Sequence, residues 1–274
     1  MISLKNLTGL DVSFNPSTFK LAPENEVLLQ NAPQKRLFSE LQEYLKEELP
    51  TGMTKDPAYF IYRNIARKKD TDLFRTRRIR YDITIIPPRK IRHEYIKTAG
   101  HSHPTNPGTI SYFPEVLDII SGHAYFILQK KDKENDSLLR EIYLIEALPG
   151  EKVLLLPGFG HTTVNAFQEP LIFANLIGDN FSYDYEGFRK HHGAGYWLLE
   201  GNATEAMELE KNNSYQGVPE IKKIRPKESS KLGLTKKQPL YSLFITKPEI
   251  FSYLTSPENY TKDLTVEKCF KVLR

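Results

Sequence analysis

The sequence has few of the features that would place it outside the cell or in a membrane. It contains one cysteine, Cys269, among 274 residues, which excludes an intramolecular disulfide and is typical of a reducing compartment. No apolar run reaches the roughly 18 residues of a membrane-spanning helix. The first residues lack the apolar core and the small-residue cleavage site of a signal peptide. We therefore expect a cytoplasmic protein with no membrane partner.

The charges are close to balanced, with 38 Lys and Arg residues against 34 Asp and Glu residues and a net charge of +4. This mild excess is compatible with an anionic substrate, but it is far from the basic bias of nucleic-acid-binding proteins, so no nucleic-acid partner is expected. The basic stretch 67–80 is interpreted as a solvated face, because charge runs usually are. A contribution to attracting a phosphorylated substrate is the alternative.

Composition and patterning favour a mainly β fold. Tyrosine and phenylalanine, 15 of each, are enriched in strands. From residue 57 onward, short segments rich in Tyr, Ile, Leu and Val are separated by Gly, Pro or charged turns, which predicts an antiparallel sandwich or barrel rather than βαβ units. The predicted strands lie within residues 57–65, 78–88, 93–100, 115–122, 123–130, 139–150, 152–158 and 170–178.

The segments on either side of these strands have a different character. Apolar residues recur at helical spacing over 34–49, which predicts an amphipathic N-terminal helix packed on a sheet. Residues 200–239 are poor in apolar residues and predict an extended surface segment, whereas the aromatic stretch 239–260 predicts a C-terminal helical extension. The expected divisions are an N-terminal part (1–56), a barrel (57–199) and a C-terminal extension (200–274).

Four side chains of metal-binding type fall in the central third of the chain. His101 and His103 are two residues apart, so in an extended segment both project to one face. Glu115 and His161 follow, each near a Pro- or Gly-containing turn. Three imidazoles and one carboxylate suit a borderline divalent metal ion such as Fe, Mn, Ni or Zn and leave coordination positions for solvent or substrate.

The wider pattern resembles the two-part motif of the cupins and, more narrowly, the cupin-type glucose-6-phosphate isomerases. The resemblance covers about residues 57–187. It rests on the sequence TAGHSH around His101 and His103, on Glu115–Val116, on Gly122 before a strand, on HTTVN from His161, and on the tyrosine pair of Tyr183–Asp184–Tyr185. It implies a cupin fold, that is, a double-stranded β-helix or jelly-roll barrel, in a homodimer.

The resemblance also implies roles for individual residues. The metal ligands of the family carry over to His101, His103, Glu115 and His161. Its contacts to the sugar phosphate carry over to Thr84, Thr98, Gly100 and Tyr185. Hydroxyl groups and a glycine amide are chemically suited to donate hydrogen bonds to phosphate oxygens. For Thr84 and Thr98, an ordinary role as β-branched strand residues is an equal alternative.

The sequence departs from the family pattern at several positions. Leu117 and Ile177 stand where tyrosines are usual, and Tyr183 stands where a histidine is usual. The stretch between His103 and Glu115 is longer than in the archaeal members, and the turn before His161 reads PGFG. These changes leave the metal ligands intact but bear on the identity of the substrate.

The implied activity is the interconversion of glucose 6-phosphate and fructose 6-phosphate, which moves hydrogen between C2 and C1. Glu115 is the candidate general base, Tyr185 is its main rival, and a hydride shift is the alternative to proton transfer. Three other functions stay open: an isomerase or epimerase of another sugar phosphate, a cupin dioxygenase, and a non-catalytic sugar-binding cupin.

Overall fold

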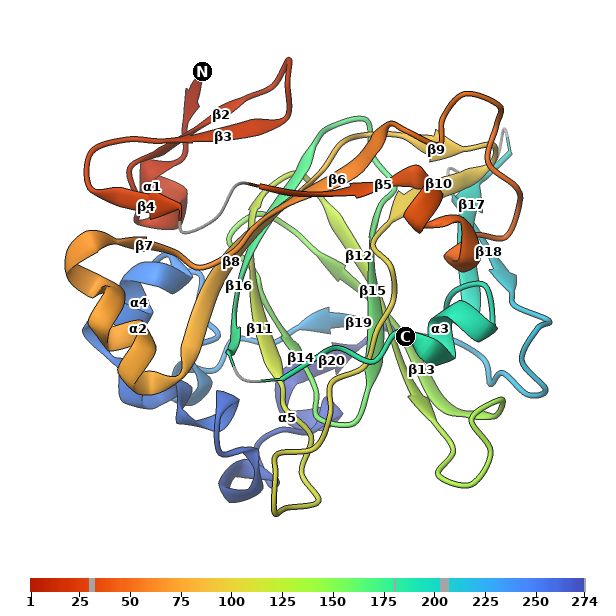
Figure 1. The fold of residues 1–274 in the computed structure, drawn as a ribbon. Coiled ribbons are helices and arrows are strands. Elements are labelled where there is room, and N and C mark those ends of the chain that lie inside the picture. Colours follow the sequence, from red (N-terminus) through yellow and green to blue (C-terminus); the bar gives the residue numbers. More distant parts are fainter. Residues whose placement is uncertain (30–32, 180, 203–206, 274) are drawn as a thin grey trace.

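Figure 1 shows the computed structural model, which describes residues 1–29, 33–179, 181–202 and 207–273. Within these ranges a six-stranded and a nine-stranded sheet curl around a common interior. The six-stranded sheet has the order β14 (Lys152–Leu155), β11 (Glu115–Ser121), β16 (Leu171–Gly178), β8 (Ile79–Ile86), β6 (Pro57–Tyr62), β5 (Gln34–Leu37). The nine-stranded sheet has the order β18 (Met207–Lys211), β17 (Tyr196–Glu200), β10 (Glu94–Lys97), β15 (Gly160–Asn165), β12 (Ala124–Lys131), β13 (Leu139–Ala147), β19 (Lys222–Pro226), β20 (Phe270–Val272), with β9 (Lys90–Ile91) beside β10.

The predicted mainly β cupin barrel is confirmed. Each of the eight segments predicted as a strand contains one, and β12 and β13 form a hairpin whose tip is the charged stretch 132–138. The two sheets pack their apolar side chains against each other inside the barrel. There the ring of Phe126 on β12 meets the ring of Phe173 on β16 edge to face, with 6.4 Å between ring centroids. Such double-sheet packing is how jelly-roll barrels bury their strands.

Alternation along the strands gives the six-stranded sheet two different faces. On β8, Asp82 and Thr84 line a cavity of the barrel, and Arg80, two residues before Asp82, lies on the same face of the strand. The intervening residues point outward and are covered by helices, since Tyr81 meets the ring of Tyr241 at 5.2 Å. Because helices cover the outer face, both faces of β8 are buried. In the sequence, the polar inner row can be recognised only because every second residue from Arg80 to Thr84 is polar.

The helical extension at the C-terminal end covers this outer face. It consists of η4 (Ser230–Leu232), α4 (Leu240–Thr246), η5 (Pro248–Leu254), η6 (Pro257–Tyr260) and α5 (Val266–Cys269). Phe74 on α2 (Thr71–Arg77), which follows η3 (Lys68–Asp70), packs on the rings of Tyr241 and Phe244 of α4. Figure 1 shows α4 beside α2 and below the N-terminal strands. The prediction of helices in 239–260 is confirmed.

The prediction of an amphipathic helix over 34–49 is wrong. The segment forms the edge strand β5, in which Gln34 pairs with Ile61 and Arg36 with Tyr59 of β6, and then two short 3-10 helices, η1 (Phe38–Glu40) and η2 (Gln42–Tyr44). Phe38 and Leu41 are fully buried. Their spacing resembles that of a helix because two consecutive tight turns bury both side chains. Pairing with β6 outweighs the local helical preference.

The sheets extend past the predicted boundaries of the barrel. β5 lies before residue 57, whereas β18 and β19 lie in the stretch 200–239 that was predicted as an extended surface segment. β19 pairs in parallel with β13. Residues 203–206 of that stretch lie outside the described residues. The division at 56/57 and 199/200 itself stays a prediction.

The remaining elements lie at the edges. Before the barrel come β1 (Ile2–Ser3), α1 (Lys5–Thr8), β2 (Val12–Asn15), β3 (Lys20–Pro23) and β4 (Val27–Leu29), of which β4 pairs with β7 (Ile65–Arg67). A short helix, α3 (Glu186–Lys190), follows the last barrel strand. Among the described residues, no helix has the length and apolar character needed to cross a membrane.

A buried ion pair links the barrel to the C-terminal extension. Asp118 of β11 contacts the ammonium of Lys152 at 3.0 Å and accepts the backbone N–H of Leu240 at the start of α4. Both side chains are at most 3% exposed, and burial raises the pKa of Asp118 to about 6 in spite of the lysine. Removing one partner of such a pair leaves an uncompensated buried charge.

We therefore expect Asp118→Ala to lower the free energy of unfolding by about 3–5 kcal/mol, measured by urea denaturation. The double variant Asp118→Leu with Lys152→Met should recover most of this loss, because it removes both charges. Asp72→Ala is the control, since Asp72 pairs with Arg75 on the exposed surface, and it should change stability by no more than about 0.5 kcal/mol. Equal stability of Asp118→Ala and Asp72→Ala would contradict the assigned role.

Candidate metal centre and substrate cavity

Backbone pairing places His101 beside His161. The two residues exchange hydrogen bonds, from the His101 N–H to the His161 carbonyl at 3.0 Å and from the His161 N–H to the His101 carbonyl at 2.9 Å. The segment after β10 thus continues to pair with β15 beyond Thr98, whose N–H donates to the Thr163 carbonyl. Directly opposed residues in an antiparallel pair share a face, so both imidazoles point into the barrel.

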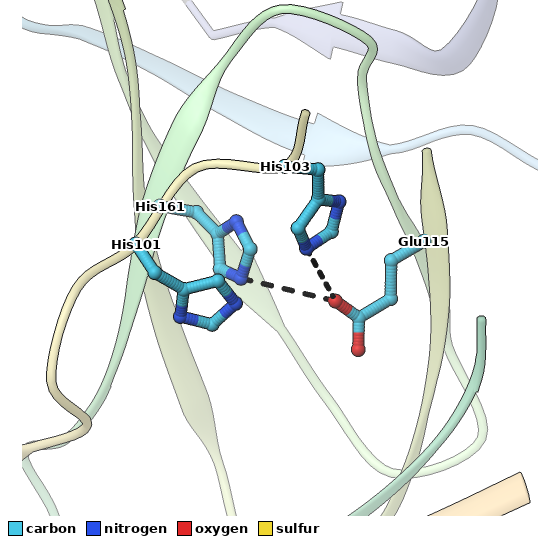
Figure 2. A group of neighbouring side chains, drawn as sticks. All are labelled: His101, His103, Glu115 and His161. Atoms are coloured by element: carbon cyan, nitrogen blue, oxygen red, sulfur yellow. Dashed lines mark ion pairs between the residues drawn. The ribbon is translucent and has the colours of Figure 1, made fainter. Parts of the chain in front are cut away.

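His103 and Glu115 complete the cluster. Figure 2 shows the three imidazoles and the carboxylate pointing toward one another from three segments of the chain. The Glu115 Oε2 atom lies 3.4 Å from His103 Nε2 and 3.9 Å from His161 Nε2. One donor atom of each of the four residues lies within 4.8 Å of all the others. The four residues predicted as ligands therefore converge inside the barrel.

Backbone carbonyls orient two of the rings. The Nδ1 atom of His101 lies 3.3 Å from the Ala99 carbonyl, and the Nδ1 atom of His103 lies 2.9 Å from the Phe113 carbonyl. A carbonyl only accepts, so each Nδ1 carries the proton and each Nε2 keeps its lone pair. The Nε2 atoms of both rings are buried and have no hydrogen-bond partner in the described part of the chain.

The electrostatic surroundings of His101 and His161 favour the neutral imidazole. Desolvation and the neighbouring His103 lower the pKa of His101 well below its usual value. Desolvation and the neighbouring His101 likewise lower the pKa of His161. A neutral imidazole is the form that binds a metal ion, so this cluster is ready to do so near neutral pH.

The cluster fits a divalent metal ion. Buried polar nitrogens without partners are rare and costly, and here the Nε2 atoms of His101 and His103 are both unpaired in a cluster that includes the Glu115 carboxylate. Three imidazole nitrogens and one carboxylate oxygen suit Fe, Mn, Ni or Zn, in agreement with the predicted cofactor, and the donor set does not select one of the four. The carbonyl contacts to Nδ1 are the outer interactions that metal-binding histidines normally make.

Gly100 lies outside the cavity, although the resemblance implies that it contacts phosphate. A Cβ atom at Gly100 would meet the ring of Phe188 at 2.1 Å, and one at Gly160 would meet the same ring at 2.7 Å. Phe188 of α3 thus packs on the two glycines that directly precede His101 and His161. The absence of a side chain at both positions lets this ring support the backbone that carries two of the ligands.

A second backbone pairing brings two tyrosines to the cluster. Ser102 and Asp184 exchange backbone hydrogen bonds at 2.8 and 2.9 Å, so the flanking Tyr183 and Tyr185 reach the cavity. The Tyr183 ring lies 4.4 Å from the His101 ring, and its hydroxyl accepts a hydrogen bond from Arg80. Burial raises the pKa of Tyr183 well above its usual value. Tyr185 lies 5.4 Å from the ring of His101.

The cavity in front of the cluster contains three of the four residues predicted to contact substrate. Thr84, Thr98 and Tyr185 line it together with the ligands His101, Glu115 and His161. The Thr98 hydroxyl accepts the Thr163 backbone N–H at 3.0 Å, which leaves its own hydrogen available for donation into the cavity. These positions agree with the predicted roles, which themselves stay predictions.

Sequence reasoning missed most of the polar lining. Further polar residues in the cavity wall are Arg36, Tyr59, Arg63, Asp82, Thr163, Asn175 and Tyr183. Arg63 and Arg80 both contact the Oδ2 atom of Asp82, at 3.1 and 2.9 Å. A signal was present, because Arg80, Asp82 and Thr84 alternate along one predicted strand. Arg80 belongs to the basic stretch interpreted as a solvated face, yet its side chain is 10% exposed.

Comparison with known proteins identifies the family. Residues 35–216 match the family model described as Glucose-6-phosphate isomerase (GPI). The chain belongs to the glucose-6-phosphate isomerase family. The family resemblance predicted from the motifs is confirmed, and the match extends beyond residues 57–187 at both ends, to include β5 and β18.

Individual relatives support the assignment at low identity. The chain is 28% identical to a glucose-6-phosphate isomerase of Pyrococcus abyssi over 199 residues, which cover 72% of this chain and 92% of that protein. It is 27% identical to one of Thermococcus litoralis over 173 residues, covering 60% and 82%. One of Thermococcus kodakarensis is 29% identical over 168 residues, covering 60% and 79%.

Solved structures are more distant. An oxalate oxidase in complex with glycolate is 12% identical with a TM-score of 0.36, covering 52% of this chain and 61% of that chain. Bacillus subtilis oxalate decarboxylase is 17% identical with a TM-score of 0.33, covering 51% and 30%.

Removing one imidazole should empty the metal centre. We expect the purified parent protein to hold about one divalent metal ion per chain after dialysis, and His161→Ala to lose most of it, because the change removes both a donor and the geometry. Elemental analysis of the dialysed proteins measures this directly. His123→Ala is the control, since His123 pairs with Glu146 outside the cluster. Full occupancy in His161→Ala would assign that residue another role.

Proposed function

We propose that this member of the family is a metal-dependent aldose–ketose isomerase that interconverts glucose 6-phosphate and fructose 6-phosphate. The observation that carries the proposal is the convergence of three imidazoles and one carboxylate, of which His101, His161 and Glu115 line a polar cavity, in a chain that belongs to this family. The homodimer and the cytoplasmic location expected from the sequence are part of the same proposal.

The isomerisation needs a base that reaches both C1 and C2 of the open-chain sugar. Glu115 is suited to this role because its two oxygens have different surroundings. Oε2 faces the histidine nitrogens, whereas the other oxygen points away from all three rings in Figure 2. In our proposal this second oxygen accepts the proton from C2 and returns it to C1.

A bound divalent ion would supply positive charge beside the sugar oxygens as a Lewis acid. The chain's own residues do the remaining work. Thr84 and Thr98 provide hydroxyl groups along the cavity, and Tyr185 provides a further hydroxyl and an aromatic ring in its wall. Arg80 holds the hydroxyl of Tyr183 against the cluster, which narrows the space around C1 and C2.

A coupled assay tests the activity. We expect fructose 6-phosphate to be converted to glucose 6-phosphate by the metal-loaded protein, and activity to fall to background after chelation and return when Fe, Mn, Ni or Zn is added. Unphosphorylated fructose is the substrate control. A metal-loaded protein that leaves fructose 6-phosphate unchanged would contradict the proposal, and oxygen consumption with an organic acid would indicate a dioxygenase instead.

The role of Glu115 as a base can be separated from its role as a metal ligand. We expect Glu115→Gln to remain at least about a hundred-fold less active than the parent at saturating metal, because an amide cannot accept the C2 proton. Glu146→Gln, which lies in an ion pair with His123, is the control. Restored turnover of Glu115→Gln, with no solvent deuterium at C1 or C2 of the product, would point to a hydride shift.

A further inference from the structure

Arg36 and Arg63 line the cavity, and Arg80, which contacts the lining residue Tyr183, shares the carboxylate of Asp82 with Arg63. Asp82 is 2% exposed, and its Oδ2 atom contacts both Arg63 and Arg80. Arg63 also donates to the side-chain oxygen of Gln34, and Arg80 to the hydroxyl of Tyr183. The guanidinium groups of Arg63 and Arg80 therefore already donate hydrogen bonds to acceptors within the protein.

Arg36 differs from both of these arginines. Its acidic partner is Glu40, four residues later, at 3.3 Å, and that carboxylate is 45% exposed. A solvent-exposed pair of this kind contributes little, typically about 0.3–0.5 kcal/mol. The Arg36 side chain itself is 20% exposed and lies at the cavity wall. Exchanging the contact with Glu40 for an anion in the cavity would thus cost little.

The neighbours of Arg36 are the groups predicted to contact phosphate. Its guanidinium lies 5.8 Å from the ring centre of Tyr185 and interacts with the phenol of Tyr59. That phenol in turn accepts the backbone N–H of Ala99 at 3.2 Å, directly after Thr98. A phosphate held by the hydroxyls of Thr98 and Tyr185 alone would have no cation beside it. Arg36 lies beside Tyr185 and, through the phenol of Tyr59, next to the backbone that follows Thr98.

The position of Arg36 relative to the metal cluster also suits a phosphate. Arg36 is on β5, which lies four strands from β11 and Glu115 in the six-stranded sheet. The Tyr185 ring lies near both the ring of His101, at 5.4 Å, and the guanidinium of Arg36, at 5.8 Å. In an open-chain hexose 6-phosphate, C1 and C2 are at the opposite end of the molecule from the phosphate. If the reacting carbons lie at Glu115, the phosphate lies on the side of β5.

We propose that Arg36 binds the phosphate group of the substrate and determines the preference for phosphorylated over neutral sugars. This inference rests on the proposed isomerase function, because it uses the position of the reacting carbons. A guanidinium can donate two parallel hydrogen bonds to a phosphate, which gives it geometric specificity as well as charge. In this role Arg36 is a specificity-determining residue, and Glu40 occupies it when the cavity is empty.

A pair of ligands that differ only in the phosphate tests the inference. Glucitol 6-phosphate lacks a carbonyl group and cannot be isomerised, and glucitol is its neutral counterpart. Calorimetry on the metal-loaded parent should show much tighter binding of glucitol 6-phosphate. In Arg36→Gln, binding of glucitol 6-phosphate should weaken about ten- to hundred-fold, the loss expected for a charge-assisted contact, with glucitol binding and metal content unchanged.

Two further variants serve as controls. Arg75→Gln removes the same charge from an exposed position on α2 and should leave the affinity for glucitol 6-phosphate unchanged. Arg36→Lys keeps the charge without the two-pronged geometry, so its loss should be smaller than that of Arg36→Gln, and it provides a readout if the glutamine variant folds poorly.

The outcomes distinguish this inference from the proposed function. Unchanged binding of glucitol 6-phosphate by Arg36→Gln, or an equal loss in Arg75→Gln, overturns the role of Arg36 even if the parent isomerises fructose 6-phosphate. If the parent binds neither ligand, the inference is also overturned. If Arg36→Gln weakens the binding of glucitol 6-phosphate as expected but the parent does not isomerise fructose 6-phosphate, the phosphate site stands and the proposed reaction is wrong.

Discussion

The site depends on a group of unpartnered donor atoms buried between the two curled sheets of the barrel. The Nε2 atoms of His101 and His103 are buried without hydrogen-bond partners among the described residues, and the carboxylate of Glu115 lies within 4 Å of two imidazoles. Leaving a buried polar group unpaired typically costs about 1–3 kcal/mol. A metal ion bound at this point would satisfy these atoms together, which would give the arrangement a physical reason to exist.

Much of the surrounding structure serves to hold these four side chains in place. Reciprocal backbone hydrogen bonds fix His101 against His161, and the Phe188 ring packs on the glycines that precede them. Pairing of Ser102 with Asp184 adds the two tyrosines. The strands that carry the polar row of β8 and the ligand Glu115 of β11 are covered on their outer face by α2 and α4.

The sequence was informative wherever a short-range pattern determined the structure. Short segments rich in Tyr, Ile, Leu and Val between turn residues located the barrel strands, and the spacing of His101, His103, Glu115 and His161 identified a cluster that the fold brings together. The family resemblance rested on the same motifs. These features are encoded within a few residues of one another, or in motifs long enough to be specific.

The sequence was less informative where distant partners decide the structure. Residues 34–49 have helical spacing, but β6 pairs with their first part and tight turns bury the rest, so Arg36 faces the cavity from a strand. The strands β18 and β19 come from a stretch with low apolar content, because they join the sheet at its periphery. Gly100 illustrates the same limit, since the ring that requires a glycine there comes from residue 188.

The most direct test of the account is a crystal structure of the purified protein with diffraction data collected on both sides of the absorption edge of its metal. The account predicts one anomalous peak per chain inside the barrel, about 2.0–2.2 Å from the Nε2 atoms of His101 and His103, a ring nitrogen of His161 and an oxygen of Glu115. An anomalous peak elsewhere in a metal-containing protein, or these four side chains pointing away from one another, would contradict it.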